Sequence, residues 1–173
     1  ITNLVSNAGV VASDVTGVGT ARRFLEACEY GGDKGIFGFG TTGSKVSMTN
    51  LVSNAGVVAT DTAGVGTARQ FLAACSYGGD KGIFAFGDKT GPEVNITNLV
   101  SNAGVVATDV TGVGTARYGL AACEFGGDKG ILGYGYVGGA SSLTNLVSNA
   151  GVVATDTTGV GTARYYPGAC SFN

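Results

Sequence analysis

The stretch TNLVSNAGVV decides the fold, because it occurs four times, beginning at Thr2, Thr49, Thr97 and Thr144. Successive copies are therefore 47, 48 and 47 residues apart. This period is typical of proteins that repeat one supersecondary unit, and each unit buries its apolar face only against a neighbour. We therefore expect a single repeat domain over residues 1–173, with units at 1–20 (partial), 21–67, 68–115, 116–162 and 163–173 (partial).

The composition excludes several classes of function. Apolar residues make up 44% of the chain and charged residues 13%, and the 32 glycines favour short strands and tight turns over surface helices. A net charge of -2 gives no basic surface for nucleic acid. Every apolar run ends before the roughly 18 residues needed to span a bilayer, so we expect no membrane insertion. The chain has no histidine, and the same carboxylates recur in every unit, so we expect no enzyme, no cofactor and no metal.

One unit shows four apolar segments of strand length, separated by turn-forming residues such as Gly-Gly-Asp at 78–80. A helix over 67–75 is the competing interpretation, with Thr67 as its cap. The equivalent segment near the end of the chain contains Pro167 and Gly168, which would break a helix. We therefore predict four strands per unit, which in the second unit cover 68–77, 81–87, 94–100 and 104–108.

The units resemble blades of a kelch-type β-propeller. The resemblance rests on Ala-Arg at 68–69, Leu-Ala-Ala at 72–74 and the segment 83–87, with counterparts beginning at 21, 25 and 36 and at 116, 120 and 131. The chain departs from the family in having a single Gly after the second strand and no Trp. The resemblance implies an all-β propeller of about four four-stranded blades, in which the two termini share the closing blade.

The near-identical copies also resemble repeats in virion or tail-associated proteins of aquatic bacteriophages. That resemblance implies a structural or host-contacting role in a virion or another extracellular assembly, put together in a reducing cytoplasm if the source is viral. The implied partners are other structural proteins, copies of the chain itself and a cell-surface glycan. We therefore expect a non-enzymatic structural or binding module, and a lectin-like, carbohydrate-binding propeller is the alternative.

Differences between the copies indicate where a ligand would bind. The units differ chiefly in the segments 41–48, 88–96 and 136–143, which we expect to be loops on one face. Tyrosine rings at varying positions can stack on a sugar or pack on a protein. A dinucleotide site at Gly-Val-Gly-Thr-Ala 17–21 is a weaker alternative, because the motif recurs in every unit and lacks its third Gly. The predicted ligand-binding residues are Arg23, Gln70, Tyr118, Tyr136, Tyr165 and Tyr166.

Two further sets of residues occupy one position per unit, and we predict that both are structural. An Asp precedes an Arg by eight residues in each unit, and we expect a bidentate Asp–Arg ion pair that locks successive units. One Cys per unit is predicted to fill a small buried slot, with a thiolate metal site on a common axis as the alternative. These residues are Asp14, Arg22, Asp61, Arg69, Asp109, Arg117, Asp156 and Arg164, together with Cys28, Cys75, Cys123 and Cys170.

Overall fold

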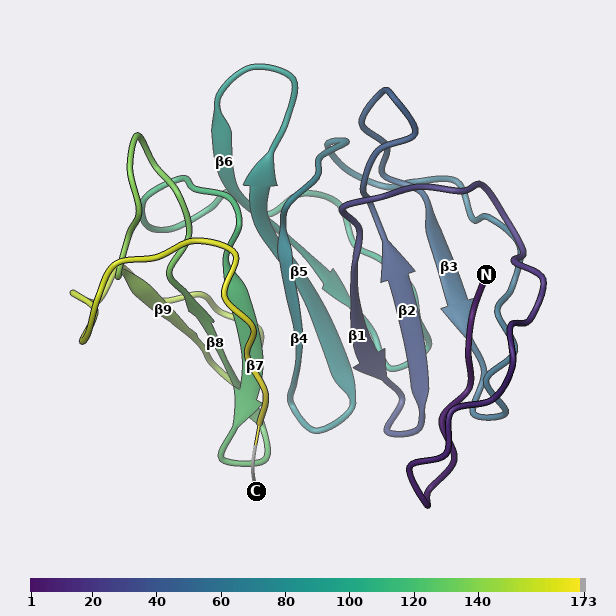
Figure 1. Ribbon diagram of the computed structural model, residues 1–173. Coiled ribbons are helices and arrows are strands. Elements are labelled where there is room, and N and C mark those ends of the chain that lie inside the picture. The colour runs from purple at the N-terminus through teal and green to yellow at the C-terminus, as the bar shows by residue number, and fades with distance from the viewer. Residues whose placement is uncertain (172–173) are drawn as a thin grey trace.

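The computed structural model describes residues 1–171, and positions 172–173 of the last partial unit lie outside the described residues. Within 1–171 the chain is all-β, with nine strands in three separate antiparallel sheets (Figure 1). No helix of this part of the chain is long and apolar enough to span a bilayer. The sheets consist of β1 (Glu26–Tyr30), β2 (Lys34–Gly38) and β3 (Thr49–Val52); β4 (Ala73–Tyr77), β5 (Lys81–Asp88) and β6 (Glu93–Val100); and β7 (Ala121–Phe125), β8 (Lys129–Gly133) and β9 (Thr144–Val147).

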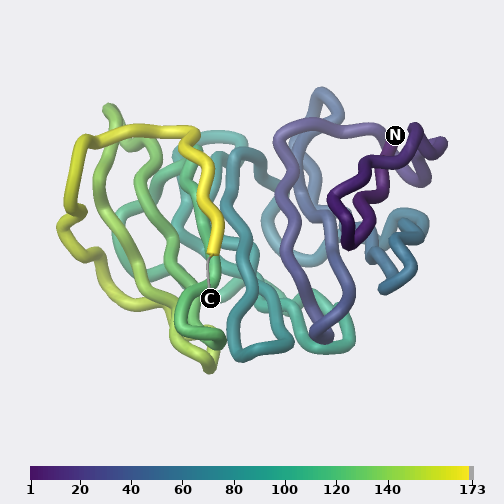
Figure 2. The backbone as a smooth tube through the Cα atoms, turned by 60° about the horizontal axis from the view of Figure 1, so that its bottom comes forward, coloured from purple at the N-terminus to yellow at the C-terminus, as the bar shows by residue number. Residues whose placement is uncertain are grey.

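The predicted propeller of four-stranded blades, with the two termini in one closing blade, is wrong. Each sheet has three strands, and the three sheets are not closed into a ring. The N-terminal segment pairs with itself, through Thr2 with Val15 and Val5 with Val11. It lies at one end of the row of sheets, whereas the yellow C-terminal end of the described chain lies beside β7 (Figures 1 and 2).

The fourth expected strand of each unit fails because its pairing is out of register. In the second unit this outer segment pairs with β6 only at two isolated bridges. Between the two bridges the outer segment has three residues (107–109) and β6 has two (98–99), so no continuous ladder forms. The side-chain amide of Asn98 enters this gap and donates to the Ala107 carbonyl at 3.0 Å. Asn50 and Asn145 do the same in the other units. The two bridges join Val100 with Val106 and Thr97 with Val110.

The sheets pack face to face, and this buries the middle sheet on both sides. β1 contacts β4 and β5, and β4 contacts β7 and β8. Accordingly the six inner residues of β5 are all buried, where a strand with one solvated face would alternate. Two apolar clusters fill the two gaps between sheets. The first consists of Tyr30, Ile36, Phe39, Leu72, Phe84 and Val100, and the second of Ala73, Cys75, Tyr77, Ile83, Ala85, Phe86, Leu120, Leu132, Val147 and Val153.

A cysteine of one sheet packs against a glycine of the next sheet. A Cβ atom placed on Gly82 of β5 would lie 2.5 Å from the Cys28 Sγ atom of β1, and one on Gly130 would lie 2.7 Å from the Cys75 Sγ atom. Each thiol therefore sits in a space that only a glycine leaves open. Burial raises the pKa of the Cys28 and Cys75 thiols to about 12, as expected for unreactive structural cysteines.

Candidate binding site

Four of the predicted tyrosines lie together with two phenylalanines. We call Phe24, Phe71, Tyr118, Tyr136, Tyr165 and Tyr166 the aromatic cluster. Its ring centroids are separated by 4.2 Å between Phe24 and Phe71, 5.4 Å between Phe71 and Tyr166, 5.4 Å between Tyr118 and Tyr136, 5.4 Å between Tyr136 and Tyr165 and 5.3 Å between Tyr165 and Tyr166. These spacings are those of tilted and edge-to-face aromatic pairs.

Backbone hydrogen bonds between equivalent positions of the four units assemble the cluster. The amide of Phe71 donates to the Phe24 carbonyl at 3.3 Å, the Gly119 amide to the Phe71 carbonyl at 2.8 Å, and the Tyr166 amide to the Gly119 carbonyl at 2.8 Å. Phe24, Phe71 and Tyr166 have φ angles of 58°, 53° and 52°. Bulky residues rarely adopt this left-handed conformation. Phe39, Phe86 and Tyr134, outside the cluster, also adopt it, so it belongs to the repeat as a whole.

The third unit has a glycine where the other three have an aromatic residue. A Cβ atom on Gly119 would lie 2.8 Å from the Tyr166 ring, so the glycine makes room for that ring. The loss of a side chain at Gly119 in the third unit therefore leaves the space that the Tyr166 ring of the fourth unit occupies.

The cluster lies at the edge of the molecule where the units vary most. The segments 41–48, 88–96 and 136–143 all lie at one end of the sheets, and Tyr136 belongs to the last of them (Figure 1). Phe24, Tyr165 and Tyr166 are exposed, and Phe71, Tyr118 and Tyr136 are half-buried. Burial, followed by the charge of neighbouring phenols and carboxylates, raises the pKa of Tyr118 and Tyr166. Both phenols are therefore neutral hydrogen-bonding groups at neutral pH.

The other two predicted ligand-binding residues lie at the margin of the cluster. The Arg23 guanidinium carbon is 5.2 Å from the centroid of the Phe24 ring. The Gln70 side-chain amide donates to the Asp88 carboxylate at 3.1 Å, and Lys45 forms a 2.7 Å ion pair with the same carboxylate. Gln70 is thus engaged with charged neighbours, and Arg23 contributes a cation to one ring.

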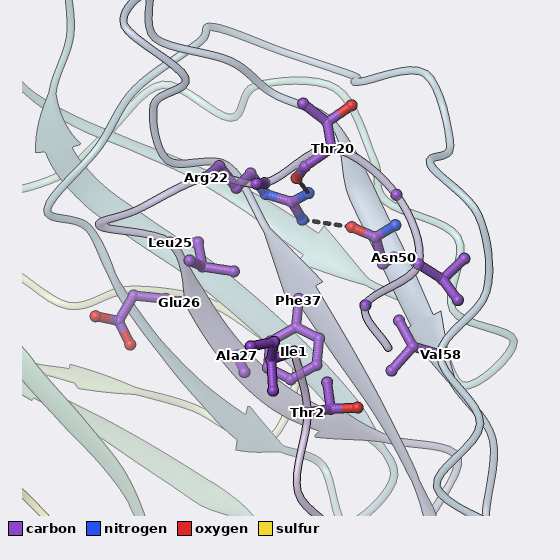
Figure 3. A pocket seen from close by; sticks show the side chains of 14 residues that line it. Ile1, Thr2, Thr20, Arg22, Leu25, Glu26, Ala27, Phe37, Asn50 and Val58 are labelled. Atoms are coloured by element: carbon purple, nitrogen blue, oxygen red, sulfur yellow. Dashed lines mark hydrogen bonds between the residues drawn. The ribbon is translucent and has the colours of Figure 1, made fainter. Parts of the chain in front are cut away.

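The repeated Asp and Arg residues of each unit form a polar network with the threonine that directly precedes the unit, and we call this network the carboxylate latch. In the first unit the Thr20 amide and hydroxyl donate to Asp61 at 2.9 and 2.6 Å, and the Asn50 amide donates to it at 2.9 Å. Arg22 lies 3.6 Å from the same carboxylate and donates to Asn50 at 2.6 Å (Figure 3). The partner of Arg22 is therefore Asp61, 39 residues later in the chain, and Asp14 bonds to Asn3. The third unit repeats this network with Thr115, Arg117, Asn145 and Asp156. In the second unit Thr67 and Asn98 donate to Asp109 in the same way, but Arg69 donates instead to the carbonyls of Phe84 and Phe86.

The latch explains the Gly-Val-Gly-Thr motif that suggested a dinucleotide site. A Cβ atom on Gly19, which has a φ of 85°, would lie 2.5 Å from the Asp61 carboxylate. Gly66 and Gly114 have the same relation to Asp109 and Asp156. The glycine-rich turn thus binds an anion, but that anion is a side chain of the protein itself.

Each arginine after the first also stacks on an aromatic ring of the preceding sheet. The guanidinium carbon of Arg69 lies 4.1 Å from the Phe39 ring centroid, and that of Arg117 lies 4.7 Å from the Phe86 ring centroid. Both arginines are fully buried. The arginines therefore join successive sheets by stacking on aromatic rings.

The four cysteines are free. Cys75 is buried, Cys28 and Cys123 are half-buried, and Cys170 is exposed. Within residues 1–171, no three His, Cys, Asp or Glu side chains come together in an arrangement that could hold a metal ion.

A cavity of about 440 Å³ lies beneath the aromatic cluster. All four units contribute to its wall, which consists of Phe24, Glu26, Phe71, Leu72, Gly119, Leu120 and Tyr166. Sequence reasoning missed Glu26, Phe24 and Phe71 as site residues. Glu26 could have been identified from the sequence, because the other units have the uncharged residues Ala73, Ala121 and Gly168 at this position.

A second, more open cavity of about 710 Å³ lies on the outer face of the first sheet. Ile1 and Phe37 line it, and Arg22 and Asn50 form its polar edge (Figure 3). The Glu26 carboxylate points away from Ile1 and Phe37 in this view. Glu26 thus lies between the two cavities and contributes to the walls of both.

No protein-family model matches the chain, and no curated protein matches it. The function is therefore inferred from the arrangement of the residues alone.

Proposed function

We propose that the chain is a non-enzymatic binding module that holds carbohydrate on the aromatic cluster. The observation that carries the proposal is the meeting of Tyr118, Tyr136, Tyr165 and Tyr166, which come from two different units. Phenol rings present an apolar face for the C–H groups of a sugar and a hydroxyl for its polar groups. Aromatic side chains held by a packed scaffold lose little conformational entropy on binding.

A glycan array tests this proposal. The unmodified protein is expected to bind a subset of glycans, and Tyr165→Ala is expected to weaken that binding about tenfold, the effect of losing one stacking face. Tyr165→Phe keeps the ring and should retain most of the affinity. Val152→Ala removes an exposed apolar side chain outside the cluster and serves as the control. Failure of the unmodified protein to bind any glycan, or unchanged binding by Tyr165→Ala, would contradict the proposal.

A second candidate is an architectural role in a larger extracellular or virion assembly. Tyr30 and Tyr77 are 4% and 3% exposed, because the turn of the following sheet covers each ring at Gly104 and Gly151. Their counterpart Phe125 in the third sheet is 37% exposed. This difference supports a partner that presents a further sheet of the same repeat, such as a second copy of the chain.

Sedimentation velocity over a range of concentrations separates the two candidates. An architectural role predicts concentration-dependent self-association that Phe125→Ser abolishes. A monomer at all concentrations, together with glycan binding, would favour the binding module alone.

A further inference from the structure

The cavity beneath the aromatic cluster contains a carboxyl group that the rest of the structure does not use. Glu26 is half-buried, and no group in residues 1–171 forms a hydrogen bond or ion pair with its side chain. The corresponding residues Ala73, Ala121 and Gly168 have no charge to accommodate. Glu26 is therefore an addition to the repeat, and the fold does not require it.

The wall around Glu26 is aromatic and aliphatic. The rings of Phe24, Phe71 and Tyr166 form part of it, and Leu72 and Leu120 complete it. A carboxylate in such surroundings is poorly solvated and gains most from a partner of opposite charge. The negative faces of aromatic rings attract the same kind of partner.

The chemistry of the wall selects among cations. A metal ion needs several oxygen, nitrogen or sulfur ligands, and the cavity offers a single carboxylate beside hydrocarbon. An alkylated ammonium group is apolar on its surface and positive overall, so it matches both parts of the wall. Phe24 already attracts a cation, since the Arg23 guanidinium lies 5.2 Å from its ring centroid.

We propose that this cavity binds an organic ammonium group, with Glu26 as its counter-ion and the three rings as its cage. The proposal goes beyond carbohydrate binding and does not depend on it. The volume of about 440 Å³ is sufficient for a small alkylammonium compound.

Binding of a cation at the proposed site should depend on pH. Burial raises the pKa of Glu26 to about 7, so the carboxylate becomes fully charged only above neutrality. The segments before β4 and β7 bring Phe71, Leu72, Gly119 and Leu120 to the wall, and none of these residues is ionisable. Burial raises the pKa of the Cys28 thiol, on the same strand as Glu26, and of the Tyr166 phenol. Arg23, on the segment before β1, places its guanidinium carbon 5.2 Å from the Phe24 ring centroid. Affinity for the cation should therefore increase from pH 5 to pH 8, as Glu26 loses its proton.

Titration with choline, followed by calorimetry and by tyrosine ring resonances, tests the proposal. The uncharged isostere 3,3-dimethyl-1-butanol is the matched probe, and at pH 8 it should bind about tenfold or more weakly than choline. Glu26→Ala reproduces the residue of the second and third units, so it should fold, and it should lose that tenfold preference. Glu29→Ser removes an exposed carboxylate of the same strand in favour of the residue found at 76 and 171, and it should change nothing.

Three results would overturn the proposal: no choline binding at pH 8, equal binding of the two probes, or an undiminished preference in Glu26→Ala. The two proposals can fail separately. Glu26→Ala should leave glycan binding intact, and Tyr165→Ala should leave choline binding intact, because Tyr165 does not line the cavity.

Discussion

At the scale of single residues, small departures from a repeated pattern determine where this protein can bind a ligand. Glu26 replaces an alanine, Gly119 replaces an aromatic residue, and both lie in the wall of one cavity. The residues that all units share hold the fold together instead, as in the carboxylate latch. A repeated scaffold thus tolerates a carboxyl group in an apolar setting at one position, because the neighbouring sheets supply the stability.

Glu26→Gln is expected to change how stability depends on pH. Glu26 has a raised pKa of about 7 in the folded chain, whereas its pKa in the unfolded chain is near 4.3. Between these values the folded state binds more protons, so the stability of the natural protein falls as pH rises from about 4.5 to about 7. The glutamine variant lacks this loss. After allowance for partial exposure, it should gain ~1–2 kcal/mol relative to the natural protein between pH 4 and pH 8.

Urea unfolding at the two pH values measures this difference. Glu29→Gln, at an exposed position of the same strand, is the control. Parallel pH profiles for the natural protein and Glu26→Gln would show that Glu26 is solvated.

Asp109→Asn should destabilise the protein by about 1–3 kcal/mol at pH 7, because the Thr67 amide and hydroxyl and the Asn98 amide lose their charged acceptor. Burial alone would raise the pKa of Asp109, but these hydrogen bonds and the Arg69 charge lower it below its usual value. The latch therefore contributes stability above about pH 4 and loses it as pH falls through the folded pKa. Thermal unfolding of Asp14→Asn, whose carboxylate accepts from Asn3, provides the comparison. An equal loss in both variants would mean that the latch adds nothing.

At the scale of strands and sheets, the second and third strands of the second unit could be predicted closely from the sequence. Segments expected at 81–87 and 94–100 are observed as β5 and β6, within one residue at each end. The first strand was expected from residue 68 but begins at Ala73. The reason is tertiary, since Phe71 is in the left-handed region and bonds to the preceding sheet.

The residues of the aromatic cluster could likewise be predicted from the sequence only in part. Tyr118, Tyr136, Tyr165 and Tyr166 could be proposed because they differ between units. Phe24 and Phe71 look like core residues in the sequence, and only the stacking of the sheets brings them to the cluster. The sheets have three strands because the segment that follows the third strand has one residue too many to pair continuously with it. The pattern of apolar and polar residues does not reveal this extra residue.

Gly82→Ala tests the contact between sheets at this scale. The added methyl group would lie 2.5 Å from the Cys28 Sγ atom and 3.0 Å from the Glu29 carbonyl oxygen, so we expect a loss of about 1–3 kcal/mol in urea unfolding. Gly35→Ala places the same group on the first sheet, where its nearest contact is 3.6 Å away, and should be nearly neutral. Adding Cys28→Ala should restore part of the loss. Equal effects of the two glycine variants would contradict the proposed packing.

At the scale of the whole molecule, both proposals depend on one arrangement. Equivalent positions of four units are brought side by side by backbone hydrogen bonds, although they are nearly fifty residues apart in sequence. The differences between copies then accumulate on one edge of a row of stacked sheets, while the identical parts form the interfaces (Figure 1). A repeat protein of this kind changes its ligand by altering residues at this edge, without altering its sheets.

Nuclear Overhauser spectroscopy on protein with labelled tyrosine rings measures this arrangement directly. The structure predicts ring-to-ring contacts between Tyr136 and Tyr165 and between Tyr165 and Tyr166, whose centroids are 5.4 and 5.3 Å apart. It predicts no contact from these rings to Tyr30 or Tyr77, which are buried between the sheets. Absence of the Tyr136–Tyr165 contact in the folded protein would contradict the convergence of the units on one site.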